Sequence, residues 1–219
     1  MKRLFFLSLA IVTITSASCK KLRLKGEGPV VSETRYVSPF NQINADGDVD
    51  VDVYPSSENK VEVSGYHNLV PVYKTEVSGN TLKLHFQDGY INVRNNNIHV
   101  SVYTTQPAGV KINGSGNINV SSGFQPGSMS ADVNGSGKIS IANNHFGNMD
   151  LRVNGSGEID ASSCTGDYVT AKISGSGNIK ITVGNSLDAH ISGSGDIDYW
   201  GNPGTVNTDI SGSGKIRKH

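Results

Sequence analysis

The chain has 219 residues, of which 36% are hydrophobic and 17% charged, and its 19 acidic residues balance 19 basic ones. A nucleic-acid partner requires a basic face that neutralises phosphates, so this neutral composition argues against one.

The first residues predict an export signal over 1–18. Two basic residues precede an apolar stretch at 4–14, which is too short for a bilayer that requires about 20 residues. Small residues then lead to Cys19, a pattern typical of bacterial lipoproteins, so we expect a lipid on Cys19 that makes the membrane a partner. The alternative is an ordinary cleaved signal, because Ser16 stands where lipoproteins usually have Leu.

Residues 19–32 are charged and lack apolar periodicity, which predicts a linker between the lipid and a single domain at 33–219. The expected location is the cell envelope, with the lipid in the outer membrane. Lys20 and Lys21 differ from the acidic export tag of some surface lipoproteins, so both the periplasmic and the surface face stay open.

A degenerate copy of a later repeat begins at Ile43, where "INADGDVDV" aligns with "INGSGNINV" from Ile112. In this alignment Ala45 and Asp46 replace the first Gly and the Ser of the repeat. The next 69 residues contain further alternating strands, which predict longer excursions or a strand meander; these strands are expected at 61–63, 82–86 and 98–103.

Six copies of a Gly-Ser-Gly motif follow at steps of 21, 20, 20, 18 and 19 residues, which predicts a solenoid. Each copy is an alternating strand, a glycine corner and a second alternating strand, as where Ile118 and Val120 face the core and Asn119 faces out. The glycines are expected to supply positive φ angles or close backbone approach. They are Gly114, Gly116, Gly135, Gly137, Gly155, Gly157, Gly175, Gly177, Gly193, Gly195, Gly212 and Gly214.

Two architectures fit this pattern: an antiparallel hairpin in each repeat, or a parallel β-helix in which equivalent positions stack at about 4.8 Å. Stacking favours opposite charges in neighbouring coils. One outward column alternates in sign over its last four members; it reads Asn119, Ser140, Asp160, Lys180, Asp198, Arg217. A second column pairs Lys138 with Glu158 and Asp196 with Lys215, whereas a third brings Arg152 beside Lys172.

The residue before each corner is Asn in three copies and Ser in three, which predicts a ladder of stacked polar side chains. Its members are Asn113, Asn134, Asn154, Ser174, Ser192 and Ser211. We therefore predict an all-β fold, a right-handed parallel β-helix with coils of about 20 residues, preceded by a more irregular β-strand region.

These features resemble the head GIN domain family, known as auto-transporter adhesins and common in envelope lipoproteins of Bacteroidota. The resemblance covers about 33–219 and rests on the repeated Gly-Ser-Gly-x-Ile, on "FNQINADGDVDV" from Phe40 and on "ISGSGDIDYWGNP" from Ile191. It implies a β-helical fold, an adhesin-like role and homo-oligomers, and it supplies no catalytic residue and no cofactor.

Motifs that carry catalysis or metal binding are absent from the sequence, since it contains no His-Glu-x-x-His, Cys-x-x-Cys, nucleophile elbow or Walker loop. The weak candidate for calcium is a run of alternate carboxylates, Asp46, Asp48, Asp50 and Asp52. Successive members would lie about 6.6 Å apart, at roughly 3.3 Å per residue, so one ion would need ligands from another strand. A solvated strand face is the simpler interpretation.

Four aromatic residues, Tyr90, Tyr103, Tyr199 and Trp200, could stack on sugar rings. The alternation places Tyr199 inward, and Trp200 beside "GNP" is expected mainly to pack or cap. Cys164 has no partner for a disulfide and reads as a small buried residue.

The predicted function is a non-catalytic envelope protein, adhesin-like or structural, that presents its β-faces to a protein or glycan ligand. The alternative is a polysaccharide-acting lyase or hydrolase, because β-helices also support such enzymes. A spacer without any ligand is the third hypothesis.

Overall fold

The computed structural model describes residues 22–124 and 127–219, which form β-strands and one short 3₁₀ turn, η1 (Val70–Val72). The strands are β1 (Leu22–Lys25), β2 (Val30–Tyr36), β3 (Gln42–Gly47), β4 (Asp50–Pro55), β5 (Lys60–Tyr66), β6 (Tyr73–Ser78), β7 (Thr81–Phe86), β8 (Tyr90–Arg94), β9 (His99–Thr104), β10 (Gly109–Gly114), β11 (Asn117–Val120), β12 (Ser128–Gly135), β13 (Lys138–Ile141), β14 (His145–Gly155), β15 (Glu158–Gly175), β16 (Asn178–Gly193), β17 (Asp196–Trp200), β18 (Thr205–Gly212) and β19 (Lys215–Lys218). In this part of the chain no helix is long and apolar enough to cross a membrane.

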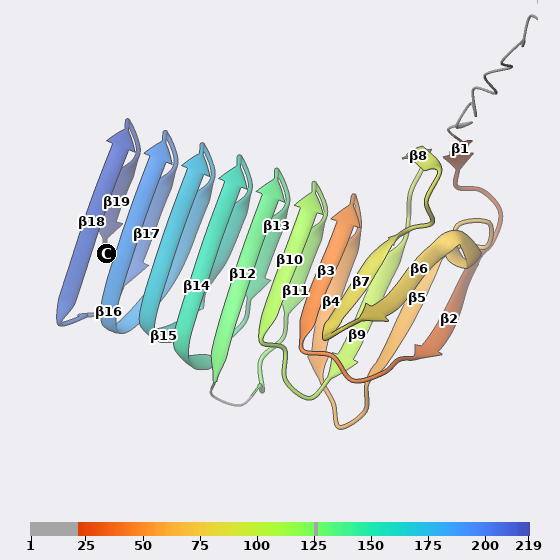
Figure 1. The fold of residues 1–219 in the computed structure, drawn as a ribbon, viewed down its shortest axis with the longest axis horizontal. Helices are drawn as coiled ribbons and strands as arrows, with labels where there is room; N and C mark the ends of the chain where they lie inside the picture. Colours follow the sequence, from red (N-terminus) through yellow and green to blue (C-terminus); the bar gives the residue numbers. More distant parts are fainter. Residues whose placement is uncertain (1–21, 125–126) are drawn as a thin grey trace, which may run out of the picture.

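The repeats form a flattened parallel β-helix, so the coil prediction is confirmed and the hairpin alternative is wrong (Figure 1). Strands before the corners make one row: β3, β10, β12, β14, the second halves of β15 and β16, and β18. Strands after the corners make the other: β4, β11, β13, the first halves of β15 and β16, β17 and β19. Every neighbouring pair in both rows is parallel.

The core lies between the two rows and is filled by the inward members of each strand. Ile118 and Val120 are buried while Asn119 is exposed, as the alternation predicts. Burying one such aliphatic side chain stabilises the fold by about 1.5–3 kcal/mol. Because the same positions are apolar in successive coils, the core is one continuous column.

The corner glycines have both predicted properties. The first glycine of each Gly-Ser-Gly has a positive φ, between 126° at Gly155 and 146° at Gly114. The second approaches the coil before it, since a Cβ on Gly137 would lie 2.6 Å from the carbonyl oxygen of Gly116. Only glycine fits both positions without strain.

The first coil exists, but its predicted alignment is wrong by two residues. Ala45 pairs with Ile112, and Gly47 pairs with Gly114 as the first corner glycine, with a φ of 94°. A shift of two residues keeps every side chain on its original face, so strand alternation cannot detect it. The corner decides the register, because this position needs a positive φ and the predicted alignment would have put Ala45 there.

A mixed sheet closes the N-terminal end of the solenoid. The predicted strands at 61–63, 82–86 and 98–103 are confirmed as parts of β5, β7 and β9, with the third beginning at His99. β7 extends one row and β9 the other, and antiparallel β6, β5 and β2 follow them. Arg35 in β2 joins the two sides, donating to the carbonyl oxygens of Tyr73 at 2.6 Å and Val70 at 2.8 Å.

The linker prediction for 19–32 requires correction where the structure describes it. β1 pairs in parallel with β8, and β2 pairs with β5 from Val30 onward, so most of 22–32 is folded against the domain. Sequence patterning did not reveal these strands, because their partners are distant in sequence: Leu22 pairs with Tyr90, and Val30 pairs with Tyr66. The signal at 1–18 and Cys19 lie outside the described residues.

Candidate functional site

The corners form one row along an edge of the solenoid, at the arrow tips in Figure 1. The backbone N–H of each corner serine donates to the carbonyl oxygen of the first glycine in the preceding coil. Ser136 donates to Gly114 at 3.0 Å, and Ser156 donates to Gly135 at 2.9 Å. All twelve predicted corner glycines therefore serve the stacking of backbone on backbone. We find no ligand-binding geometry among them.

A ladder of asparagine amides runs beside the corners, as predicted. Asn154 donates to Asn134 at 2.8 Å, Asn134 to Asn113 at 2.9 Å, and Asn113 to the carboxylate of Asp46 at 2.7 Å. Ser174, Ser192 and Ser211 continue the same column in register. The ladder fixes the orientation of Asp46 at the first corner.

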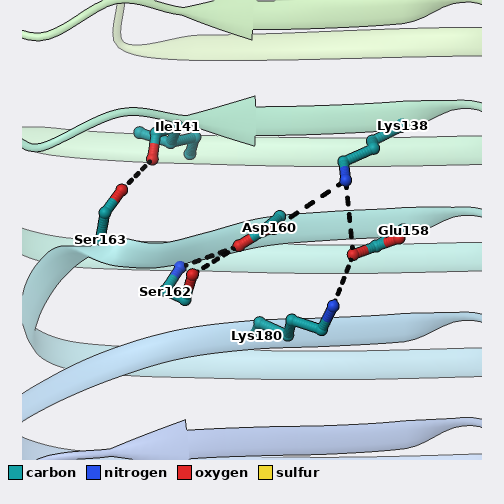
Figure 2. A network of polar contacts seen from close by, with 7 residues as sticks. All are labelled: Lys138, Ile141, Glu158, Asp160, Ser162, Ser163 and Lys180. Carbon is teal, nitrogen blue, oxygen red and sulfur yellow. Dashed lines mark hydrogen bonds and ion pairs between the residues drawn. The ribbon is translucent and has the colours of Figure 1, made fainter.

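The outward face of the second row carries the predicted charge columns, which make ion pairs between coils. In Figure 2 Glu158 lies between Lys138 at 3.6 Å and Lys180 at 3.0 Å. Beside it, burial raises the pKa of Asp160, but hydrogen bonds from Ser162 and the charges of Lys138 and Lys180 lower it more, so the net shift is downward. A carboxyl group held ionised in this way is a poor general acid.

The four predicted calcium candidates do not converge on one point. Asp50 accepts from the Asn117 amide at 2.7 Å, and Asp52 accepts from Asn119 at 2.9 Å. Across 22–124 and 127–219, no group of three or more His, Cys, Asp or Glu side chains could hold a metal ion. Asp46, Asp50 and Asp52 thus extend the polar ladders, and Asp46 also lines a cleft together with Asp48.

This cleft, of about 480 Å³, lies between the first corner and the segment that connects β7, β8 and β9. One wall is the corner itself, with Asp46, Gly47 and Asp48. The opposite wall comprises His85, Phe86, Asp88, Tyr90, Asn92, Val93 and Asn96. Its volume exceeds those of three other hollows on the described residues, which measure about 390, 290 and 240 Å³.

Local contacts hold this wall in place. Asn96 donates its side-chain amide to the backbone carbonyl of Asp48, which ties the β8–β9 loop to the corner. The Phe86 ring packs edge-on against buried Tyr73, with ring centroids 5.0 Å apart. Asn92 has a φ of 53°, a left-handed conformation that costs free energy and is often found at functional sites.

The lining groups suit a ligand with hydroxyl groups and apolar ring faces. Asp46, Asp48 and Asp88 can accept hydrogen bonds, and the amides of Asn92 and Asn96 can both donate and accept. Phe86 and Tyr90 supply aromatic surface. The lining contains no Lys or Arg, so the cleft is acidic and disfavours anionic ligands.

The other aromatic candidates lie away from the cleft. Tyr103 stacks on Tyr54, with centroids 5.4 Å apart. Tyr199 is 8% exposed, which confirms its inward position, and Trp200 stacks on His219 at 4.8 Å, which agrees with a packing role.

Cys164 is buried among core residues, as predicted. Burial raises the pKa of its thiol to about 11, so the reactive thiolate is scarce at neutral pH.

Sequence reasoning found Asp46, Asp48 and Tyr90 but missed the rest of the cleft. His85 lies near the end of β7, Asp88 lies in the turn that follows, and Asn92 and Asn96 lie in the Asn-rich segment "NVRNNN". That segment was the available signal, because asparagine adopts positive φ more readily than other non-glycine residues.

Comparison with protein-family models matches residues 39–203 to the family described as "Putative auto-transporter adhesin, head GIN domain". No curated protein matches the chain. Similar solved structures include a "putative adhesin" from Bacteroides fragilis (19% identity, TM-score 0.69), a "putative lipid binding protein" from Parabacteroides distasonis (23%, 0.60) and a "putative adhesin" from Parabacteroides merdae (23%, 0.52). Each alignment covers 90% of this chain and 99–100% of the other. At these identities the likeness concerns the fold.

Proposed function

Because the chain belongs to the head GIN domain family of "putative auto-transporter adhesins", we propose that it is an adhesin-like, non-catalytic module of the cell envelope that binds a saccharide in its acidic cleft. The observation that carries this proposal is the combination, in one hollow, of three carboxylates, two amides and two aromatic rings. The solenoid provides a rigid support for this site.

The expected ligand is a neutral or amino-bearing saccharide. Carboxylates and amides bind hydroxyl and ammonium groups, and an aromatic ring covers the apolar face of a sugar. A uronic-acid polymer would bring negative charge towards Asp46, Asp48 and Asp88. This argues against the alternative of an enzyme that acts on such polymers.

The proposal also includes a lipid on Cys19 as the membrane anchor, with the outer membrane as its location. It is supported by the sequence pattern of the first 19 residues. β1 begins at Leu22, and three residues span at most about 10 Å. The closed end of the domain would therefore lie next to the membrane. Metabolic labelling with a fatty acid tests this, since Cys19→Ser should abolish the label; an unchanged label would contradict the anchor.

The function is tested by screening the purified protein on a saccharide array, followed by titration with the best ligand. Tyr90→Ala should weaken binding about tenfold, because a lost ring contact of about 1.4 kcal/mol corresponds to that factor. Tyr168→Ala is the matched control, as this tyrosine is 56% exposed on the distant β15. Equal effects of the two variants would contradict the cleft as the site. Recovery of the saccharide unchanged is expected, whereas cleavage lost in Asp48→Asn and Asp50→Asn would favour the enzyme.

A further inference from the structure

The last coil, β18 and β19, leaves the solenoid core open at the end opposite β1 and β2 (Figure 1). Among the described strands, β18 pairs only with β16 and β19 only with β17. Val206 and Ile210 are 39% and 43% exposed, although their partners one coil earlier, Leu187 and Ile191, are 1% and 2% exposed. A strand edge with apolar inward side chains is a template for another strand.

The features that usually block such an edge are missing from β18. Its inward positions are Val206, Thr208 and Ile210, and the strand contains no Pro and no inward charge. The inward register of β19 ends in Lys218, whose ammonium donates to the Asn202 side chain at 2.7 Å. At the other end β2 is also an edge strand, but there the Arg35 guanidinium crosses to Val70 and Tyr73 and covers the end of the core. An inward charge of this kind is a recognised protection of an edge.

We propose that this open coil binds the same coil of a second copy, with β18 of each copy antiparallel to β19 of the other. A two-fold axis parallel to the strands produces this arrangement, because it exchanges the two rows and preserves strand direction. The contact uses the same surface on both copies, so it closes at a dimer. Both cores then join into one.

Charge selects this arrangement over the other two-fold pairing. The outward side chain of β18 that carries charge is Asp209, which is 78% exposed, and those of β19 are Lys215 and Arg217. A two-fold axis perpendicular to the sheets would bring β19 against β19 and oppose like charges, which destabilises a strand pair. The proposed pairing opposes acid and base instead.

The register follows from the corner. Asp209 and Arg217 are each four residues from Ser213, and Ile210 and Ile216 are each three residues from it. With the two corners level, Asp209 of one copy lies beside Arg217 of the other, and Ile210 lies beside Ile216 on the core side. Each dimer contains both pairs twice.

Light scattering and sedimentation of the full chain with Cys19→Ser test the oligomeric state over a range of concentrations. A monomer–dimer equilibrium is expected. Ile210→Lys should raise the dimer dissociation constant at least tenfold, and Val30→Lys, at a 62% exposed residue of β2, should leave it unchanged. A strict monomer, growth into open-ended oligomers, or loss of the dimer in Val30→Lys would overturn the proposal.

Crosslinking tests the register of the two copies independently of the Ile210→Lys variant. In the same Cys19→Ser background, Cys164 is buried, so Asp209→Cys and Arg217→Cys each add one accessible thiol. Mild oxidation of a mixture of the two variants should give crosslinked dimers, and either variant alone should give few. Efficient crosslinking of Asp209→Cys alone would show β18 against β18 and would contradict the assigned pairing.

Discussion

The two ends of the solenoid are built differently. At the N-terminal end, β2, β5 and β6 continue the two rows, and Arg35 joins them across the core. At the other end the rows stop with a coil whose strand β18 is exposed along its whole length. The closed end also contains the cleft, whose wall at 85–96 is built by chain outside the repeat.

The repeat mainly supplies stacking, and two hollows on its coils, of about 290 and 240 Å³, are smaller than the cleft. Each inner coil presents nearly the same surface as its neighbour, with charges paired between coils. Binding specificity therefore has to arise where the repeat is interrupted, and self-association where it is exposed. The following substitutions test these roles.

The largest loss of folding stability is expected from a substitution at an inner corner of the solenoid. Gly135→Ala places a Cβ against the carbonyl oxygen of Gly114 at a φ of 129°, so we expect a loss of about 3–5 kcal/mol in the free energy of unfolding. Gly47→Ala is the control at the first corner, where nothing lies within 4 Å of the added Cβ. It should cost only about 1–2 kcal/mol for its positive φ. Equal losses in urea unfolding would contradict close stacking as the reason for the inner glycines.

The next effect concerns the closure of the N-terminal end. Arg35→Ala should cost about 2–4 kcal/mol, because two buried carbonyl groups lose a charged donor. Arg152→Ala, on a side chain that is 46% exposed and ion-paired at the surface, should cost less than about 1 kcal/mol. Thermal unfolding of both variants checks the difference. If Arg35→Ala melts like Arg152→Ala, Arg35 does not close the end.

A smaller effect is expected in the amide ladder. Asn134→Ala removes one hydrogen bond to Asn113 and one from Asn154, so a loss of about 1–2 kcal/mol is expected. Ser192→Ala occupies the serine half of the same column and should be within about 0.5 kcal/mol of the parent. The comparison of urea midpoints measures what the amides add. A neutral Asn134→Ala would show that the ladder contributes nothing.

The smallest effect at neutral pH is expected at Asp198, near the open end. Burial raises its pKa, but hydrogen bonds from His219 and Arg217 lower it more, so the folded pKa lies below the ordinary value. The unfolded chain therefore binds this proton more readily, and the stabilisation is complete above about pH 4 and lost as pH falls through the folded pKa. The free energy of unfolding in urea should therefore fall less between pH 5 and pH 2.5 in Asp198→Asn than in the parent protein. If the free energy of unfolding of Asp198→Asn falls as much as that of the parent protein between pH 5 and pH 2.5, the lowered pKa of Asp198 is contradicted.

The sequence predicted the regular part of the fold well, because each coil needs the same kinds of residue at its inward, outward and corner positions. The charge columns around Glu158 identified the stacking, and the alternation around Ile118 identified the core. The alignment of the first coil failed at Gly47, since a shift of two residues changes no face.

The closed end and most of the cleft could not be predicted. They depend on partners far apart in sequence, such as the Asn95 amide that donates to the Gly26 carbonyl 69 residues away. No repeat signals such contacts, and a solvated strand face was the simpler interpretation of Asp46 and Asp48. Tyr90 was found only as one of four aromatic candidates.

Hydrogen exchange with and without the saccharide selected by the array separates binding in the cleft from binding on the flat faces, because it reports on the cleft and on every coil in one experiment. Slower exchange is predicted at 46–48 and 85–96, with the inner coils unchanged. Protection spread along the strands of the inner coils, with none around Tyr90, would show that the flat faces bind the saccharide and would contradict binding in the cleft.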